Sequence, residues 1–326
     1  MTGVQTCALP ICIPQPALDL LAEHGDVWLS PHDRPLTREE LLDAVKGADA
    51  IVCLLHDAID DGVLDAAGPQ LKVIANVAVG FNNVDTKAIE ARGTVWFTNT
   101  PGVLTEATAD IAMSLILMTT RRLGEGERVI RSETPWVWSM FYMLGSGIQG
   151  KTLGIVGLGL IGQATARRAK AFGMEIIYSG RRQADPAIEA ELGARYVSFD
   201  ELLETADVVS LHCPLNAETQ HLIDADRLKQ MRSDAFLINT TRGPVVDEQA
   251  LVDALRAGEI AGAGLDVFEE EPTVNPGLLE LENAVLIPHL GSATIETRTA
   301  MGVLAATNAI AVLGGEEPPT PVVRVG

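Results

Sequence analysis

The chain has 326 residues, of which 47% are hydrophobic, so it is long enough for two domains with sizeable cores. Its formal net charge is −20, and so acidic a chain has no general attraction to nucleic acid or to anionic lipid. Its four cysteines lack metal-ligand spacing and a dense disulfide pattern, and no apolar run is long enough to cross a bilayer. We therefore expect a cytoplasmic protein with reduced cysteines and no metal, and neither nucleic acid nor a membrane as its partner.

The first eleven residues are unusual. Residues 3–11 look like the in-frame translation of a sequencing adapter, and they lack the basic start and long apolar core of a signal peptide. A genuine but atypical leader is the alternative. If residues 1–11 are an artefact, they should pair poorly with the rest of the domain and bury few apolar side chains.

From Pro16 onward, helices and strands are predicted to alternate, as in a parallel sheet covered on both faces. Thr37 with Glu40 three residues later predicts a capping box at one helix start. Thr100-Pro101-Gly102, a cluster of breaking residues, ends this first, smaller domain. The predicted helices span 17–23, 37–46, 60–67 and 85–92, and the predicted strands span 50–55, 71–77 and 95–99.

A long helix is predicted from Thr105 to Arg122, and a segment rich in aromatic residues and methionine follows from Pro135 to Leu144. This segment either folds over its own domain or forms a contact between subunits, where aromatic residues and methionine are enriched. The composition favours the subunit contact. We therefore expect a homodimer.

A glycine-rich turn organises the second half of the chain. An apolar strand from Thr152 to Val156 runs into the spacing GxGxxG, and a helix and a second strand from Met174 to Ser179 follow. In this setting the glycines allow a tight turn, a close approach to a pyrophosphate and close packing of the helix on the strand. The pattern predicts dinucleotide binding by Gly157, Leu158, Gly159, Leu160, Ile161 and Gly162.

The turn after the second strand indicates which dinucleotide. An NAD site usually has an acidic residue there to hold the ribose 2′-hydroxyl, but this chain has Ser179-Gly180-Arg181-Arg182. Two guanidinium groups suit a 2′-phosphate, so Gly180, Arg181 and Arg182 predict that NADPH is preferred and that NADH is possible. The alternative is a solvated basic turn without a ligand.

Alternation resumes after this turn and predicts a doubly wound sheet of about six parallel strands. Ligands of such sheets bind beyond the carboxyl ends of the strands, so residues just past those ends are site candidates. Further strands are predicted at 208–212, 235–240, 261–267 and 285–287, with helices at 200–205, 225–231, 247–257 and 292–313. The candidates are Cys213, Pro214, residues 240–243, Asp266 and residues 289–292.

From about Pro16 to its end the chain resembles the D-isomer-specific 2-hydroxyacid dehydrogenases, and most of all the glyoxylate and hydroxypyruvate reductases. The resemblance rests on the glycine turn and on segments 76–81, 99–105, 211–215, 239–243, 266–272 and 288–294. Leu160 departs from the Arg that the family often has in the turn, and the leader replaces the first strand. The resemblance implies an α/β fold of two domains. They are a doubly wound Rossmann-type cofactor domain at 100–292 and a smaller flavodoxin-like substrate domain at 1–99 and 293–326.

The resemblance also implies that Arg242, Glu271 and His289 are catalytic. A guanidinium group can hold the carboxylate of a 2-oxo acid and polarise the neighbouring carbonyl. A histidine can protonate the alkoxide that hydride transfer produces, and a carboxylate on its other ring nitrogen keeps that proton available. Taken alone, each residue could instead be structural or part of a solvated surface.

The remaining implied contacts concern substrate and cofactor. Val79 and Gly80 would bind the substrate carboxylate through backbone N–H groups, with Arg242, His289 and Ser292 as further substrate contacts. The remaining cofactor contacts would be Pro214, Thr219, Thr240, Asp266 and Gly291.

The predicted activity is the NAD(P)H-dependent reduction of a small 2-oxo acid, glyoxylate or hydroxypyruvate, to the D-2-hydroxy acid. One alternative is an NAD-dependent dehydrogenase of another D-2-hydroxy acid, of the 3-phosphoglycerate type. The other is a dinucleotide-sensing interaction protein of the same fold, because fold alone does not determine function.

Overall fold

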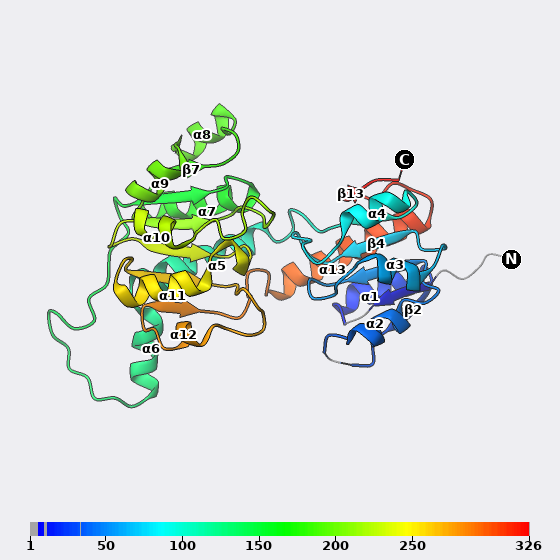
Figure 1. Cartoon of the computed structure of the whole chain (residues 1–326), viewed down its shortest axis with the longest axis horizontal. Helices are drawn as coiled ribbons and strands as arrows, with labels where there is room; N and C mark the ends of the chain where they lie inside the picture. Colours follow the sequence, from blue (N-terminus) through cyan, green and yellow to red (C-terminus); the bar gives the residue numbers. More distant parts are fainter. Residues whose placement is uncertain (1–5, 10–11, 33, 326) are drawn as a thin grey trace. The chain divides into compact units, whose positions relative to one another are not determined.

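A computed structural model describes residues 6–9, 12–32 and 34–325. The chain divides into two compact units, one formed by residues 1–104 with 294–326 and the other by residues 105–293. These divisions lie a few residues from the expected ones after residues 99 and 292. Figure 1 labels many of the elements of both units, and each unit is described by itself below.

The first unit is built on a six-stranded sheet in the order β13-β5-β4-β3-β1-β2. All neighbours pair in parallel except β13, which runs antiparallel to β5. The sequence did not predict β2 or β13, both short strands at the edges of the sheet, where little apolar burial marks them. The strands are β1 (Thr6–Leu9), β2 (Asp26–Leu29), β3 (Ala50–Cys53), β4 (Val73–Asn76), β5 (Trp96–Thr98) and β13 (Pro321–Val323).

Helices cover both faces of this sheet. On one side α13 packs against α1 and against β3, β4 and β5. On the other, side chains of α2, α3 and α4 share an apolar core with the sheet. The capping box at α2 is confirmed, with hydrogen bonds from Glu40 N to Thr37 Oγ1 (3.3 Å) and from Thr37 N to Glu40 Oε2 (2.8 Å). The helices are α1 (Gln15–Ala22), α2 (Arg38–Ala44), α3 (Asp61–Ala67), α4 (Thr86–Arg92) and α13 (Ile295–Leu313).

The expectation that the leader pairs poorly is wrong for residues 6–9. They form β1, which lies between β2 and β3 and pairs in parallel with both. Cys7, Ala8 and Leu9 are at most 4% exposed. A strand inside a parallel sheet needs a short run that is apolar on both faces, and Cys-Ala-Leu meets that need. Residues 1–5 and 10–11 of the leader lie outside the described part of the chain.

The second unit is built on a seven-stranded, wholly parallel sheet in the order β12-β11-β10-β9-β6-β7-β8. The sequence predicted about six strands and missed β8, an edge strand of three residues of which two are exposed. The strands are β6 (Thr152–Val156), β7 (Glu175–Ser179), β8 (Ala194–Tyr196), β9 (Val208–Leu211), β10 (Phe236–Asn239), β11 (Gly262–Leu265) and β12 (Ala284–Leu286).

The doubly wound arrangement is confirmed. One core joins α5 and α7 to the sheet, and a second joins α9, α10, α11 and α12 to its other face. The chain moves outward from β6 to β7 and β8, and then returns to β9 on the other side of β6. Ligands of such sheets bind where the strand order reverses, beyond the carboxyl ends of the strands. The helices are α5 (Thr105–Thr120), α6 (Leu123–Arg131), α7 (Leu160–Ala171), α8 (Pro186–Leu192), α9 (Phe199–Thr205), α10 (Ala225–Gln230), α11 (Glu248–Ala257) and α12 (Pro276–Leu279), with a 3₁₀ turn η1 (Gly243–Val245).

None of the helices in the described ranges combines the length and the apolar character that crossing a membrane requires.

Candidate active site

The glycine turn joins β6 to α7 at the reversal of strand order. Gly157 has φ +96°, and a Cβ there would lie 3.0 Å from the backbone of His212 and Cys213, so glycine is required. A Cβ on Gly162 would lie 2.5 Å from Gly157 O, so α7 packs closely on the turn. Gly159 has open space instead. It is the N-cap of α7 without a side-chain capping bond, so a phosphate fits against the N–H groups of the first helical turn.

Leu158, Leu160 and Ile161 complete this turn. The Leu158 carbonyl accepts a hydrogen bond from Gln163 Nε2 (3.2 Å), which fixes the turn against the second turn of α7. Leu160 and Ile161 are the first residues of α7, and Leu160 is 61% exposed. The residues of the turn therefore fit the pyrophosphate of a dinucleotide.

The basic turn after β7 is exposed. Gly180 is held by a hydrogen bond from Tyr196 Oη to its carbonyl (2.9 Å). Arg181 and Arg182 are exposed, and neither side chain forms an ion pair in the described part of the chain. The turn after β7 thus carries two unpaired guanidinium groups and no carboxylate. Such a turn suits a ribose with an anionic 2′-phosphate better than a ribose with a free 2′-hydroxyl.

Other residues assigned to the cofactor follow β9 and β10. Thr219 Oγ1 donates a hydrogen bond to the carbonyl of Pro214 (2.6 Å), which closes the loop after β9. Thr240 directly follows β10 and is 9% exposed, and its Oγ1 has no hydrogen-bond partner among the described residues. A buried hydroxyl without a partner is unfavourable, so Thr240 is suited to bonding a ligand.

His289 and Glu271 form a hydrogen-bonded pair, with Nδ1 and Oε2 2.7 Å apart. Oε1 of Glu271 accepts a second bond from Phe268 N (3.0 Å). Partial burial raises the pKa of Glu271. The hydrogen bond to His289 and the charge of His289 lower it, as do the Phe268 N–H and the charge of Arg242. These contributions outweigh the effect of burial, so the pKa of Glu271 lies below its usual value. Glu271 is therefore ionised at neutral pH, and its carboxylate fixes the orientation of the His289 ring through Nδ1.

His212 provides the contrast. Its Nε2 contacts Ser210 Oγ (2.9 Å), and burial lowers the pKa of the imidazole to about 4. A neutral, buried ring of this kind cannot donate a proton near neutral pH. His212 is therefore a structural residue and no candidate for the proton donor.

Asp266 fixes the backbone around His289. His289 has φ +51°, an unusual conformation for a residue with a side chain, and its N–H donates to Asp266 O (2.9 Å). The Asp266 carboxylate accepts bonds from Leu290 N (2.5 Å) and Gly291 N (2.8 Å). Burial raises the pKa of Asp266, and these N–H groups and His289 oppose the rise. Asp266 and Gly291, which the sequence assigned to the cofactor, are thus also bonded to each other.

Arg242 lies between β10 and η1. Asn239 Nδ2 donates to the Arg242 carbonyl (2.9 Å), and Arg242 Nη1 donates to the carbonyl of Thr241 (2.8 Å). Burial lowers the pKa of Arg242 while Glu271 raises it, and a guanidinium keeps its charge at neutral pH in either case. Arg242, Glu271 and His289 therefore follow three adjacent strands at one edge of the sheet.

Gly243 explains how the loops of Arg242 and Glu271 come together. A Cβ on Gly243 would lie 1.9 Å from the carbonyl carbon and oxygen of Phe268. The two backbones are in contact at this point, so no side chain fits between them. At Gly291 the fit is tight but not closed: a Cβ would lie 3.1 Å from the side-chain oxygen Asp266 Oδ2, and the Gly291 carbonyl accepts a bond from Thr108 Oγ1 (3.1 Å). The sequence did not indicate a role for Thr108, because its hydrogen bond joins two residues that are 183 positions apart in the chain.

We expect Gly243→Ala to lower the free energy of unfolding by about 1–3 kcal/mol or more, because the Phe268 backbone must move. Urea denaturation measures the change. Gly180→Ala is the matched control, since Gly180 lies in an exposed turn where a Cβ would come no closer than 3.9 Å to Arg182 O, and it should leave the free energy of unfolding nearly unchanged. Equal stability of Gly243→Ala and the wild type would show that the two loops are not in contact.

The remaining predicted residues are Ser292, which is half-buried directly after Gly291, and Val79 and Gly80, which follow β4 in the first unit. Val79 and Gly80 are half-buried as well. Their carbonyls accept hydrogen bonds from Asn99 Nδ2 (2.8 Å) and Asn76 Nδ2 (3.2 Å), respectively.

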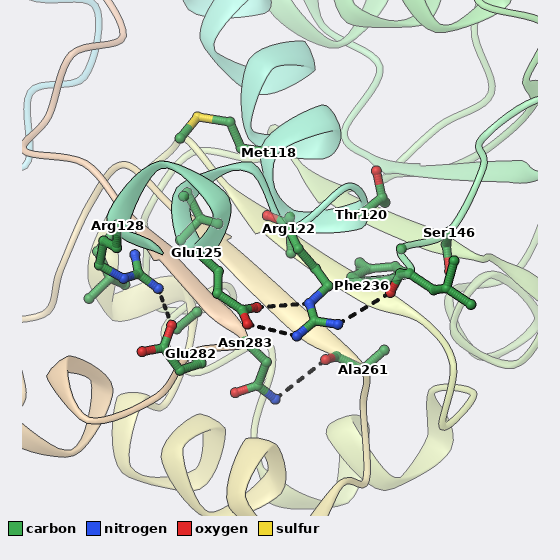
Figure 2. Close-up of a pocket in the computed structure, with 17 residues that line it drawn as sticks. Met118, Thr120, Arg122, Glu125, Arg128, Ser146, Phe236, Ala261, Glu282 and Asn283 are labelled. Atoms are coloured by element: carbon green, nitrogen blue, oxygen red, sulfur yellow. Dashed lines mark hydrogen bonds and ion pairs between the residues drawn. The ribbon is translucent and has the colours of Figure 1, made fainter. Parts of the chain in front are cut away.

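A cavity of about 440 Å³ lies at the opposite edge of the second unit's sheet, where β10 and β12 begin. Figure 2 shows that its charged side chains pair with one another, Arg122 with Glu125 (2.7 and 2.8 Å) and Arg128 with Glu282. None of the residues predicted for cofactor or substrate lines it. The cavity is therefore separate from the predicted site.

Comparisons with known proteins agree with this geometry. Residues 113–291 match the family described as D-isomer specific 2-hydroxyacid dehydrogenase, NAD binding domain. A glyoxylate reductase of Thermococcus onnurineus (strain NA1) is 49% identical over 317 residues, which cover 96% of this chain and 94% of the relative.

Two solved structures are also similar. The TT0316 protein from Thermus thermophilus has a TM-score of 0.91 at 45% identity, covering 98% of this chain and all of that one. An NADPH-dependent glyoxylate/hydroxypyruvate reductase from Sinorhizobium meliloti, in complex with NADP and malonate, has a TM-score of 0.85 at 35% identity, covering 98% and 97%. The family match spans the sheet edge where Arg242, Glu271 and His289 follow their strands, and the identity extends over nearly the whole chain. The chain therefore belongs to the D-isomer specific 2-hydroxyacid dehydrogenase family.

Proposed function

We propose that this NAD(P)-dependent oxidoreductase reduces glyoxylate and hydroxypyruvate to the corresponding D-2-hydroxy acids. The observation that carries the proposal is the 2.7 Å contact between His289 Nδ1 and Glu271 Oε2, one strand away from the turn that holds Arg242. Support for the substrates comes from relatives that are named glyoxylate reductase and glyoxylate/hydroxypyruvate reductase.

Each catalytic side chain has a separate task in this proposal. The bound nicotinamide cofactor supplies the hydride. Arg242 holds the substrate carboxylate and polarises the ketone or aldehyde oxygen. His289 donates the proton from Nε2 to the developing alkoxide, since its Nδ1 is engaged by Glu271. Glu271 orients the ring, and its negative charge compensates the positive charge of the imidazolium in the transition state.

Backbone groups complete the substrate contacts. We propose that Val79 and Gly80 donate N–H bonds to the substrate carboxylate and that Ser292 contacts the substrate beside His289. The two oxygens of a carboxylate together accept about four hydrogen bonds. Arg242 alone cannot supply donors on every side of the substrate carboxylate, so further donors are needed.

We propose NADPH as the preferred cofactor. Gly180 leaves room beside the ribose, and the exposed, unpaired Arg181 and Arg182 supply positive charge where a carboxylate would repel a 2′-phosphate. Thr240 Oγ1, buried and without a partner in the described part of the chain, is a further candidate donor to the cofactor.

The test is the oxidation of NADPH and NADH followed at 340 nm with glyoxylate, hydroxypyruvate and pyruvate. We expect turnover with glyoxylate and hydroxypyruvate at a higher kcat/KM than with pyruvate. Absence of turnover with both glyoxylate and hydroxypyruvate, under either cofactor, would contradict the proposal.

We also propose that the enzyme acts as a homodimer through the segment between α6 and β6. In Figure 1 this segment loops away from the sheet of its own unit. Val137, Trp138 and Phe141 are 80%, 74% and 86% exposed, which is unusual for clustered apolar side chains, and Trp136 stacks on Tyr142 with ring centroids 6.2 Å apart. Sedimentation should give a dimer for the wild type and a monomer for Trp138→Ser with Phe141→Ser. A monomeric wild type would contradict this role.

A further inference from the structure

In the loop after β4, the carbonyl groups of Ala78, Val79 and Gly80 each accept a hydrogen bond. Ala78 O accepts from Thr100 N (2.9 Å), Val79 O from Asn99 Nδ2 (2.8 Å) and Gly80 O from Asn76 Nδ2 (3.2 Å). The N–H groups of Val79 and Gly80 have no hydrogen-bond partner in the described ranges. Three consecutive carbonyls are thus bound by residues at the end of β4 or just past the end of β5.

Because peptide units are planar and trans, these hydrogen bonds also determine where the N–H groups of Val79 and Gly80 point. Within one peptide unit the C=O and N–H bonds point opposite ways, so a bond that fixes Val79 O also fixes the N–H of Gly80. Likewise, the bond from Thr100 N to Ala78 O fixes the N–H of Val79. Of these two carbonyls, only Val79 O is held by a side chain, that of Asn99.

Asn99 is itself held by a chain of polar groups that leads through Thr320, which is half-buried like Asn99, to the buried side chain of Asn308. Thr320 Oγ1 donates to Asn99 O (2.6 Å), and Asn99 N donates to Thr320 O (3.4 Å). The side chain of Asn308, on α13 and 0% exposed, exchanges two bonds with Thr320, through Nδ2 (2.8 Å) and Oδ1 (3.0 Å). Satisfied polar networks of this kind rigidify the groups they connect.

We propose that Asn99 is a positioning residue for substrate: its amide holds Val79 O so that the Gly80 N–H stays aimed at the substrate carboxylate. This inference rests on the proposed function, in which Val79 and Gly80 bind that carboxylate. Asn99 acts through the backbone and does not itself take part in the chemistry. Without its bond the loop can rotate the peptide and lose a preorganised donor.

The test uses Asn99→Leu, a neutral side chain of similar size that cannot donate, and Asn99→Asp. Both should raise the KM for glyoxylate about tenfold, the worth of one hydrogen bond to a charged group, while the KM for NADPH stays near wild type. Asn283→Asp is the control. Asn283 belongs to the second unit, where it lies at the edge of the sheet opposite to that of Arg242 and His289, and its Nδ2 also donates to backbone carbonyls, those of Leu255 (3.4 Å) and Ala261 (3.3 Å). It should leave the KM for glyoxylate unchanged.

Calorimetric titration of malonate into each protein saturated with NADP tests the inference without turnover. We expect the dissociation constant of malonate to rise about tenfold in both Asn99 variants. Wild-type affinity for malonate in Asn99→Leu would overturn the inference, and so would an effect confined to Asn99→Asp, which would reflect added charge alone. A wild type that binds no malonate would overturn it as well. Absence of glyoxylate turnover in a wild type that binds malonate would count against the proposed function only.

Discussion

His289→Ala should lower kcat for glyoxylate by about 10² to 10⁴, the usual effect of losing one positioned acid, with little change in affinity for NADPH. The loss falls on kcat because the imidazole acts on the proton in the transition state. Glu271→Gln should also lower kcat, since a neutral amide can still bond Nδ1 but cannot stabilise a charged ring. Arg242→Ala should lower kcat and also raise the KM for glyoxylate, because its charge holds the substrate carboxylate. Steady-state kinetics with NADPH and glyoxylate measure all three.

A second histidine and glutamate pair serves as the control. His221 Nε2 bonds Glu269 Oε1 at the surface, and the His221 side chain is 42% exposed. His221→Ala therefore removes the same kind of contact without touching the proposed acid, and should keep kcat within a few-fold of wild type. Near-normal turnover in His289→Ala would remove the basis for the catalytic assignment.

The second large effect is a change of cofactor preference in the double variant Gly180→Asp with Arg181→Ala. Each charge-assisted bond to a 2′-phosphate contributes about 1.5–3 kcal/mol, so two bonds favour NADPH over NADH by roughly 10² or more, reduced by exposure to water. The new carboxylate should accept the ribose hydroxyl of NADH and repel the phosphate of NADPH. The ratio of kcat/KM for NADPH to that for NADH should therefore fall by roughly 10².

Arg195→Ala is the matched control for charge, because Arg195 is another exposed arginine of the same unit and pairs with Glu201 (2.7 Å). It should leave the cofactor ratio unchanged. A wild type that already prefers NADH would contradict the role of Arg181 and Arg182 before any variant is made.

The sequence was most informative where local chemistry decides the structure. Thr152–Val156 is predicted to the residue because an apolar run ends directly at the glycine turn. The capping box at Thr37 was equally clear, because its two bonds depend on residues three apart. By contrast, β2 and β8 are short edge strands with exposed side chains, so no apolar pattern marked them. The pairing of β1 was not predicted because residues 3–11 resemble the translation of a sequencing adapter, although Cys7, Ala8 and Leu9 are apolar.

The candidate site divides in the same way. The sequence indicated the types and order of Arg242, Glu271 and His289, and the resemblance to the family is confirmed. It could not show that Asp266 bonds the two residues after His289, or that the turn at Gly243 lies against the backbone of Phe268. Those contacts join segments more than 20 residues apart, and only the packing of loops at the sheet edge creates them.

The configuration of the product tests the central claim most directly. Hydroxypyruvate reduced by the wild type with NADPH yields glycerate, which is chiral, and chiral chromatography separates its two forms. We expect D-glycerate, formed by an enzyme of the D-isomer specific family with His289 as the proton donor. Formation of L-glycerate, or no glycerate at all with either NADPH or NADH, would contradict it.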